Sequence, residues 1–327
     1  MKTLPRSGQH RFVIDEGSKV GEARRAAQTL ANFELTEELA GKVAIAATEL
    51  ANNLLNHATG GELLIQALGQ DETTCVELLA IDRGPGMTDI ARCMTDGYST
   101  GGTPGTGLGA VRRLANEFDI FSAPGEGTIV MARVGAPQTL RYGAISLALE
   151  GEIECGDAWS LVTDDDGVAL IVVDGLGHGV FAAEAAKACV ESFLVAPRDN
   201  PKDILQRAHR AMSRTRGGAA ACARLRADSM AYAGVGNITG YLISEAKSQG
   251  LVSHNGTLGL HHRLPQQLEY PVAPRALLVM HSDGVSARWD IRNRPEVLGA
   301  HPALIAAMLY RDHARERDDS TVVVVAT

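Results

Sequence analysis

The sequence predicts a two-domain protein of the α+β class. Its 327 residues exceed one ordinary domain, which holds roughly 100–200 residues. Hydrophobic residues make up 45%, enough for two cores, so wholesale disorder is excluded. Many strand patterns with few helices favour layered sandwiches over a doubly wound sheet. A Gly/Pro break at 135–140 divides the chain, and we expect domains at 1–135 and 143–327 with a linker at 136–142.

Composition excludes several classes of protein. The formal net charge is −8, and no Lys/Arg stripe with interleaved aromatics occurs, so we expect no nucleic-acid partner. No apolar run approaches the ~20 residues of a membrane span, so we expect a cytoplasmic protein without a membrane partner. The five cysteines lie far apart without a CxxC pair. Their spacing supports neither a disulfide framework nor a zinc knuckle.

Strand and helix patterns follow one another in the first segment. The apolar positions of the helix at 37–57 recur with the helical period, and Thr36 precedes it as a good N-cap. We expect strands at 11–14, 62–68, 75–81, 119–122 and 128–134, helices at 19–33, 37–57 and 107–117, and a glycine-rich loop at 82–107.

Strands dominate the second segment. We expect them at 144–149, 168–173, 219–226, 230–233, 239–243, 277–281 and 321–326, with helices at 180–194, 203–213 and 302–312.

Two motifs of the first segment suit a nucleotide. Glu49 and Asn53 are four residues apart on a helix, so both point from one face, where they can position water, a hydroxyl or Mg²⁺. Asp82 follows a strand and precedes Gly84 and Gly86. That carboxylate can accept from an exocyclic amine while the glycines let the backbone close on a flat ring.

A third motif is the glycine cluster at 101–109, which runs into a helix. Its bare amides suit phosphate oxygens. A Walker A pattern is absent, and a Rossmann fingerprint would need a strand directly before these glycines. Taken singly, the first motif also fits a satisfied polar group on a buried helix face, the second also fits a turn, and a glycine cluster alone is a weak signal.

Together and in this order, the three motifs resemble the GHKL (Bergerat) ATPase fold over residues 10–134. They are most similar to the RsbT and RsbW type of serine kinases in bacterial anti-sigma and stressosome pathways. The resemblance implies an α/β sandwich that binds ATP with Mg²⁺. It implies that Glu49 orients or deprotonates a serine hydroxyl and that Asn53 holds Mg²⁺. The implied ATP contacts are Asp82, Gly84, Gly86 and Thr128 at the adenine and Gly105, Gly107 and Gly109 at the phosphates.

Acidic motifs are spread over the second segment. Asp174, Asp283 and Asp318 adjoin apolar strand runs, and Asp157 is expected to follow the first strands. Carboxylates that face one another at strand ends repel, and divalent cations neutralise such a cluster. Oxygen donors without a Cys or His pair favour Mg²⁺ or Mn²⁺ over Zn²⁺. Each motif alone also fits a turn or a solvated cap.

In this order the acidic motifs resemble metal-dependent protein phosphatases of the SpoIIE-like branch, which includes short RsbX-type phosphatases, over 140–327. The resemblance implies an α/β/β/α sandwich and two-metal hydrolysis in which water attacks phosphorus, with Asp174 and Asp283 as catalytic residues. The implied ligands of two Mn²⁺ or Mg²⁺ are Asp157, Asp174, Asp283, Asp318 and the Gly175 carbonyl. The phosphate-binding arginine of larger phosphatases has no clear counterpart, although His178 offers a loose substitute.

The two resemblances imply a bifunctional switch. It would phosphorylate and dephosphorylate serine or threonine on a STAS-domain antagonist protein in a stress or sigma-factor partner-switching module or a stressosome. One alternative is a phosphatase whose GHKL half only binds nucleotide and partner. Another is a non-enzymatic regulator that sequesters its partner. Kinases of this type often act as dimers, so an oligomer is compatible, although no interface signature stands out.

Overall fold

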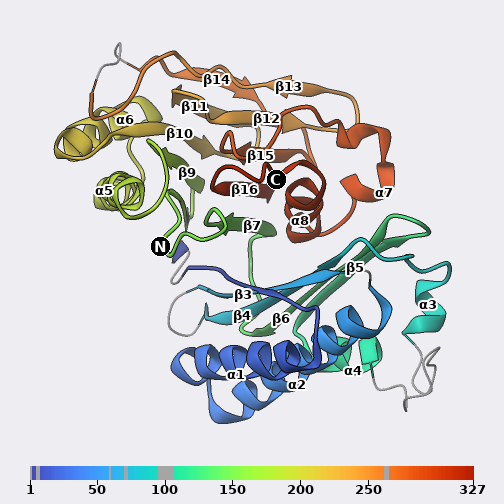
Figure 1. The fold of residues 1–327 in the computed structure, drawn as a ribbon. Coiled ribbons are helices and arrows are strands. Elements are labelled where there is room, and N and C mark those ends of the chain that lie inside the picture. Colours follow the sequence, from blue (N-terminus) through green and yellow to red (C-terminus); the bar gives the residue numbers. More distant parts are fainter. Residues whose placement is uncertain (1, 5–7, 59, 70–72, 95–106, 261–264) are drawn as a thin grey trace. The chain divides into compact units, whose positions relative to one another are not determined.

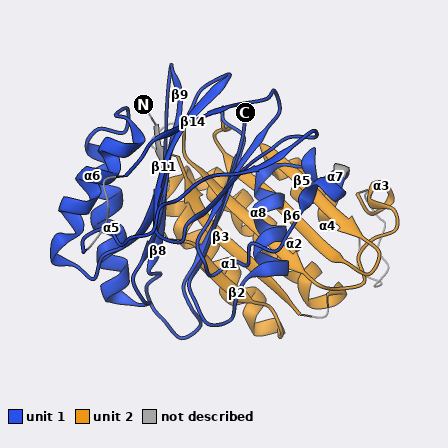
Figure 2. Ribbon diagram, turned by 90° about the horizontal axis from the view of Figure 1, so that it is seen from above, with its two compact units in different colours: residues 1–5, 140–327 blue, residues 6–139 orange. Residues whose placement is uncertain are grey.

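The computed structural model describes residues 2–4, 8–58, 60–69, 73–94, 107–260 and 265–327. The chain forms two compact units (Figure 2). We call Arg6–Thr139 the N-terminal unit, and Met1–Pro5 with Leu140–Thr327 the C-terminal unit. The first strand, β1 (Lys2–Leu4), pairs with β8 (Asp157–Asp164) and therefore belongs to the C-terminal unit. This differs from the predicted domain at 1–135, because strand pairing depends on contacts distant in the sequence.

One antiparallel sheet forms the base of the N-terminal unit, with strand order β2-β3-β4-β6-β5 (Figure 1). The long strands β3 and β4 pair from Gly61 opposite Asp82 to Leu68 opposite Cys75. Asp82 therefore stands at the end of the central strand. The strands are β2 (His10–Val13), β3 (Gly61–Leu68), β4 (Cys75–Asp82), β5 (Glu117–Ala123) and β6 (Gly127–Gly135).

Three helices pack on the sheet of the N-terminal unit: α1 (Gly17–Glu34), α2 (Glu37–His57) and α4 (Gly107–Leu114). Short alanine side chains let α1 and α2 approach each other closely, and Thr36 caps α2 by accepting from the Leu39 amide, as predicted. Helix α4 ends earlier than the predicted 107–117 because Glu117 already pairs with β6. The short helix α3 (Ile90–Cys93) follows β4.

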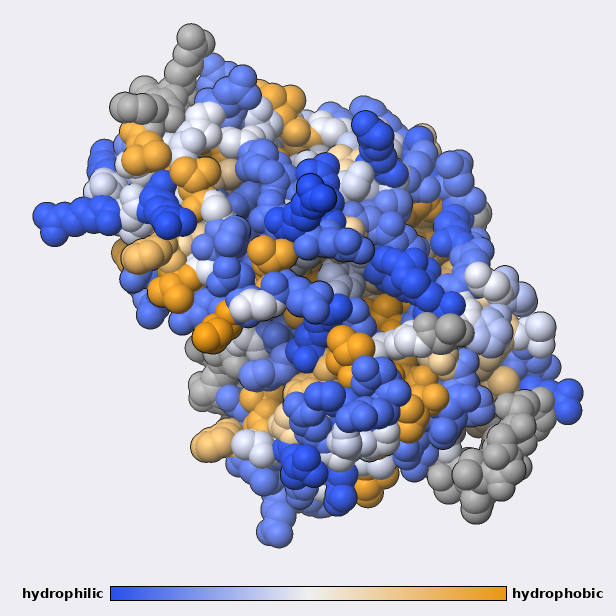
Figure 3. Space-filling model, viewed as in Figure 1, coloured by the Kyte–Doolittle hydropathy of each residue, from blue (hydrophilic) through white to orange (hydrophobic). Residues whose placement is uncertain are grey.

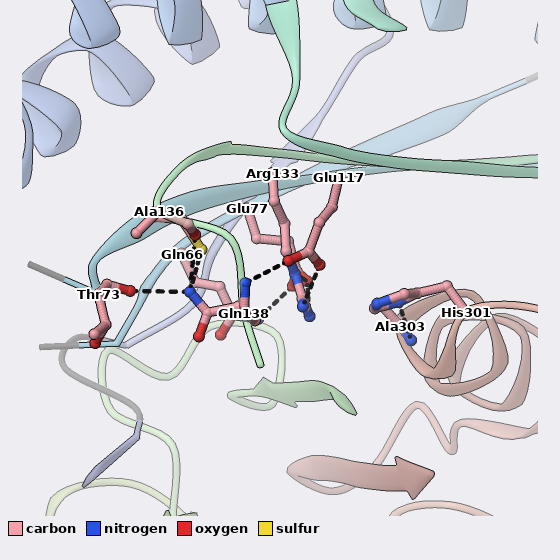
Figure 4. A network of polar contacts seen from close by, with 10 residues as sticks. Gln66, Thr73, Glu77, Glu117, Arg133, Ala136, Gln138, His301 and Ala303 are labelled. Carbon is pink, nitrogen blue, oxygen red and sulfur yellow. Dashed lines mark hydrogen bonds and ion pairs between the residues drawn. The ribbon is translucent and has the colours of Figure 1, made fainter. Parts of the chain in front are cut away.

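A buried ionic network joins four adjacent strands of this sheet (Figure 4). Arg133 Nη2 lies 2.7 Å from Glu77 Oε2, and its Nη1 lies 3.1 Å from Glu117 Oε2. Gln66 donates to the other oxygen of Glu77 at 2.7 Å. Arg133 and Glu77 are only 1% and 0% exposed, so each buried charge depends on its partner.

Two antiparallel sheets form the C-terminal unit. Their strand orders are β1-β8-β9-β10-β11-β14 and β13-β12-β15-β16-β7. The sheets contact each other where β8 meets β7 and β16. The further strands are β7 (Tyr142–Leu147), β9 (Gly167–Gly175), β10 (Gly218–Leu225), β11 (Ser229–Val235), β12 (Thr239–Ile243), β13 (Ser248–Gly250), β14 (Leu268–Pro271), β15 (Leu277–His281) and β16 (Ser320–Ala326).

Helices cover the outer faces of both sheets. The helices α5 (Val180–Val195) and α6 (Pro201–Ala211) pack on β8 to β11, and α8 (Pro302–His313) packs on β7 and β16 (Figure 1). Shorter turns are α7 (Pro295–Leu298), Met212–Arg214 and Ile291–Asn293. This arrangement is the predicted α/β/β/α sandwich, and the mixed α+β class is confirmed.

Four strands were not predicted from the sequence: β1, β8, β13 and β14. Asp157 was expected to follow a strand, whereas it begins β8. Polar residues such as Ser160 and Asp164 interrupt the apolar pattern of β8, although Ser160 is buried in the folded protein. The strands β1, β13 and β14 lie at sheet edges and span only three or four residues, which is too short to show a period.

The surface in Figure 3 is mainly hydrophilic, with several exposed hydrophobic groups on the side where α5 and α6 lie in Figure 1. Val180 and Phe181, in the first turn of α5, are 52% and 59% exposed. Within the described residues, no helix combines the length and apolar character needed to cross a membrane.

Candidate active sites

The predicted phosphate-binding end of the nucleotide site lies where α2 meets α4. Asn53 stands in the last turn of α2, and its Oδ1 lies 3.9 Å from where a Cβ of Gly107 would be. The Nδ2 atom of Asn53 is buried and has no hydrogen-bond partner among the residues described. Such a group is one that a ligand can satisfy. Glu49 lies one helical turn earlier and is half-buried.

The glycines of the predicted phosphate loop divide between described and undescribed residues. Gly107 begins α4, and Gly109 is buried within its first turn. Gly105 lies outside the described residues. The start of α4, beside Asn53, is the part of this glycine cluster that the structure describes.

The predicted adenine end is organised by Asp82. Its Oδ1 accepts from the backbone amides of Gly84, at 2.7 Å, and Thr128, at 3.0 Å. Asp82 thereby ties the loop after β4 to the start of β6. Gly86 has a φ of +68°, and a Cβ there would collide with the carbonyl oxygen of Ala123, so glycine is required.

Ser122 completes this network and was missed from the sequence. Its Oγ accepts from the Met87 amide at 2.8 Å and lies 2.9 Å from Thr128 Oγ1. It also donates to the carbonyl oxygen of Gly127 at 3.2 Å. A lone serine in a strand carries no sequence signal, because its role depends on the loop that folds against it.

The two ends of the predicted nucleotide site meet at the C-terminus of α2. A Cβ on Gly84 would lie 3.0 Å from the carbonyl oxygen of His57, the last residue of α2. The structure therefore connects the Asp82 network with the helix that carries Glu49 and Asn53.

The four predicted acidic ligands of the C-terminal unit come from both of its sheets. Asp157 and Asp174 are direct partners across β8 and β9. Asp283 follows β15, and Asp318 precedes β16. The strands β15 and β16 are neighbours in the second sheet. We call these four residues the acidic cluster.

The pKa values show that these acids influence one another. Burial raises the pKa of Asp157 well above its usual value, and the charge of Asp174 raises it further. Burial, followed by the charges of Asp283 and Asp318, raises the pKa of Asp174 to about 7. Burial and the Asp283 charge also raise the pKa of Asp318. Because acids of the second sheet act on Asp174 in the first, the acidic cluster occupies one region.

The side chains of the acidic cluster nevertheless do not stand in the geometry of a complete metal site. In the part of the chain that the structure describes, no three His, Cys, Asp or Glu side chains stand in metal-binding geometry. The mutual effects on pKa and the absence of metal-binding geometry are compatible, because charges interact over distances longer than the roughly 2–2.6 Å of a metal–oxygen bond. The donors fit Mg²⁺ or Mn²⁺ in type: they are carboxylates, and Asp157 Oδ2 is buried without a hydrogen-bond partner.

Gly175, whose carbonyl the resemblance implies as a ligand, ends β9 beside Asp174. Its amide donates to the carbonyl oxygen of Gly156 at 3.0 Å. A Cβ on Gly175 would collide with the carbonyl oxygen of Ala182, so this turn needs glycine. The loop between Asp174 and α5 is thus packed closely against the residue preceding Asp157.

Two residues that support the acidic cluster were not selected from the sequence. Asp319 is 2% exposed and accepts from the amides of Leu149, at 2.7 Å, and Gly156, at 2.9 Å. It anchors the loop before β8 beside Asp318, and burial raises its pKa. Asn237 Nδ2 donates to Asp283 Oδ2 at 2.6 Å. Only its position beside Asp318 could have marked Asp319, and Asn237 carries no such signal.

Comparison with known proteins places both units in families. Residues 164–327, which are 164 of the 327, match the family model of stage II sporulation protein E (SpoIIE). The chain belongs to the SpoIIE family. The match begins after Asp157 and includes the other three members of the acidic cluster.

The N-terminal unit matches a second family. Residues 15–134 match the model of the histidine kinase-like ATPase domain. The serine/threonine-protein kinase RsbT of Bacillus subtilis (strain 168) is 38% identical over 91 residues, covering 28% of this chain and 68% of RsbT. The predicted fusion of an RsbT-like GHKL domain with a SpoIIE-like domain is therefore confirmed.

Further comparisons match a phosphatase and a structure from work on the stressosome. The phosphoserine phosphatase RsbX of Bacillus subtilis (strain 168) is 31% identical over 103 residues, or 31% of this chain and 50% of RsbX, so the chain spans half of that relative. The fold of RsbX in complex with magnesium is similar, with a TM-score of 0.50 and 23% identity over 56% of this chain and 94% of RsbX. A structure from work on the bacterial stressosome is similar with a TM-score of 0.54 and 27% sequence identity. The match covers 57% of this chain and all of that chain.

Proposed function

We propose that this protein sets the phosphorylation level of a serine or threonine on a partner protein. The C-terminal unit would remove the phosphate by metal-dependent hydrolysis, and the N-terminal unit would add it from ATP. The observation that supports hydrolysis best is the acidic cluster, whose members come from both sheets and raise one another's pKa values. Like charges gathered in this way fit a site for divalent cations.

Asp157, Asp174, Asp283, Asp318 and the Gly175 carbonyl would hold Mn²⁺ or Mg²⁺ in the phosphatase site. Bound divalent cations supply charge neutralisation of the phosphoryl oxygens and lower the pKa of water. The remaining residues position these ligands. Asn237 orients Asp283 through its 2.6 Å hydrogen bond, and Asp319 holds the backbone that leads into Asp157.

The N-terminal unit supplies the residues for phosphate transfer. Asn53, beside the start of α4, would hold Mg²⁺ against the ATP phosphates, and Asp82 with Thr128 would bind the adenine. Glu49, one turn before Asn53 on the same helix, would accept the proton of the partner's serine hydroxyl. Asn53 Nδ2, buried without a hydrogen-bond partner, is the observation that supports a polar ligand at this end.

A STAS-domain antagonist of a partner-switching module or stressosome is the partner that we propose. RsbT is named a serine/threonine-protein kinase and RsbX a phosphoserine phosphatase, and these opposed activities support a partner that is phosphorylated and dephosphorylated. The stressosome structure, which is similar over 57% of this chain, supports the same setting. A phosphate adds roughly −1.5 to −2 charges, which is enough to make or break docking.

Two assays on the full chain test the proposal. The first measures hydrolysis of p-nitrophenyl phosphate and of a phosphoserine-carrying STAS protein with Mn²⁺ or Mg²⁺. Asp174→Asn should abolish hydrolysis, whereas Asp165→Asn, an exposed acid in the β8–β9 turn, should not.

The second assay follows transfer of labelled phosphate from ATP to the unphosphorylated STAS protein. Glu49→Gln should abolish transfer while ATP still binds, and Glu37→Gln, at the exposed start of the same helix, serves as the control. ATP binding without transfer would reduce the N-terminal unit to a nucleotide-dependent docking module. Absence of both activities would contradict the proposal and favour a sequestering regulator.

A further inference from the structure

Arg216 lies beside the loop that follows Asp174. Its guanidinium carbon is 4.9 Å from the centre of the Phe181 ring, in the first turn of α5. A Cβ on Gly177 would lie 3.2 Å from Arg216 Nη1. The guanidinium is therefore held over the Gly177 backbone by stacking on an aromatic ring.

The backbone explains why Arg216 stands there. In the β9–β10 pair, Gly218 is opposite Gly175 and Ala219 is opposite Asp174. The Leu176 amide donates to the Gly217 carbonyl oxygen at 2.9 Å, which extends this pairing by one step. Residues 217–219 pair with the end of β9, which carries Asp174 of the acidic cluster. Arg216 is the residue directly before this paired segment.

Arg216 also differs from Arg224 and Arg207, two paired arginines of the C-terminal unit. Arg224 pairs with Asp164 at 2.6 Å, and Arg207 pairs with Asp199 at 2.8 Å. Arg216 is exposed, and no carboxylate among the described residues pairs with it. A fixed guanidinium without an internal acid is available to an outside anion, and its planar fork matches phosphoryl oxygens.

We propose that Arg216 binds the phosphoryl oxygens of the phosphorylated substrate and that Phe181 is a positioning residue which holds its guanidinium. This inference rests on the proposed phosphatase function. A phosphoryl dianion that approaches four carboxylates is repelled by them, so a cation fixed at their border favours its capture. Arg216 therefore performs the task for which the sequence showed no clear arginine.

Steady-state kinetics on the full chain with Mn²⁺ test the inference, with p-nitrophenyl phosphate and a phosphoserine peptide as substrates. Arg216→Ala should raise KM for both about tenfold, with a much smaller change in kcat, because one charge-assisted contact to phosphate is lost. Arg216→Lys should recover part of this loss, since the charge remains without the fork. Phe181→Leu should raise KM less than Arg216→Ala does. Arg214→Ala removes an exposed arginine two residues away and is the matched control.

Each outcome separates this inference from the proposed function. Hydrolysis by the wild type with an unchanged KM in Arg216→Ala would overturn the role of Arg216 and leave the phosphatase standing. An equal rise of KM in Arg214→Ala would show a general charge effect and would also overturn it. A wild type without hydrolysis in Mn²⁺ or Mg²⁺ would overturn the proposed function and this inference together.

Discussion

Replacing Asp174 with asparagine should stabilise the metal-free C-terminal unit while abolishing its hydrolytic activity. Asp174 is half-buried and lies within range of the charges of Asp283 and Asp318. Its ionised form is therefore unfavourable in the folded protein. Asparagine has nearly the same shape and carries no charge, so the variant removes the repulsion without leaving a cavity.

The size of this effect follows from the pKa of Asp174, which is raised from 3.8 to about 7. At 1.36 kcal/mol per pKa unit the shift corresponds to about 4 kcal/mol. Relaxation of the side chains reduces this value, and we expect a gain in the free energy of unfolding of about 1–3 kcal/mol at pH 8.

The gain should depend on pH with a defined sign. Because the pKa is raised on folding, ionisation of Asp174 costs nothing below about pH 4, where both folded and unfolded states are protonated. The cost grows between pH 4 and 7 and is complete above pH 7. The advantage of Asp174→Asn at pH 5.5 should therefore be about half of its value at pH 8.

Urea unfolding in EDTA, followed by tryptophan fluorescence, measures this gain. The chain has two tryptophans, Trp159 and Trp289, and both belong to the C-terminal unit, so the signal reports on that unit. Asp165→Asn controls for the loss of an exposed charge. Added Mn²⁺ should stabilise the wild type more than Asp174→Asn, because the variant lacks a ligand. A variant less stable than the wild type at pH 8, or an advantage independent of pH, would refute the reasoning.

Three further predictions concern the N-terminal unit. Asp82→Asn keeps an oxygen acceptor for its amide partners, so it should leave the melting temperature unchanged while weakening ATP-analogue binding at least tenfold in calorimetry. Arg133→Met leaves the Glu77 charge buried and unpaired, so it should cost about 3–5 kcal/mol of stability in urea unfolding followed by circular dichroism. Gly86→Ala should cost more than 1 kcal/mol in the same assay, and Gly125→Ala, which has open space around it, should cost less.

Specific results would contradict these three expectations. Unchanged ATP-analogue affinity in Asp82→Asn would remove Asp82 from the nucleotide site. Adding Glu77→Gln to Arg133→Met should recover part of the stability, and no recovery would mean that the buried charge is not the cause. Equal losses in the two glycine variants would point to backbone conformation rather than to the close approach at Gly86.

Local patterns predicted much of the secondary structure. The expected bounds of α2, β12 and β15 coincide with the structure, because their apolar residues follow one period between clear boundaries. The helix predicted at 107–117 was less accurate. Its helical pattern continues into Glu117, which pairs with β6 in the fold. A local period carries no information about which distant strand a residue will join.

In the candidate sites, too, local sequence patterns predicted some residues, whereas others became evident only in the folded structure. Residues that stand in ordered motifs, such as Asp82, Asp174 and Asp283, could be selected from the sequence. Ser122 and Arg216 could not, because a serine in a strand and an arginine before a glycine are common in any protein. Their importance comes from what they contact after folding: Ser122 joins two loops, and Arg216 rests on Phe181.

Residue order and type alone were sufficient to identify an ATPase-like half and a phosphatase-like half, since glycines before a helix and acids after strands keep their chemistry wherever the chain places them. Pairing across the sheets decided the rest. Asp157 meets Asp174 because β8 lies beside β9, and Lys2–Leu4 joins the C-terminal unit because its backbone finds β8. These contacts join residues far apart in the chain, so they exist only in the folded protein.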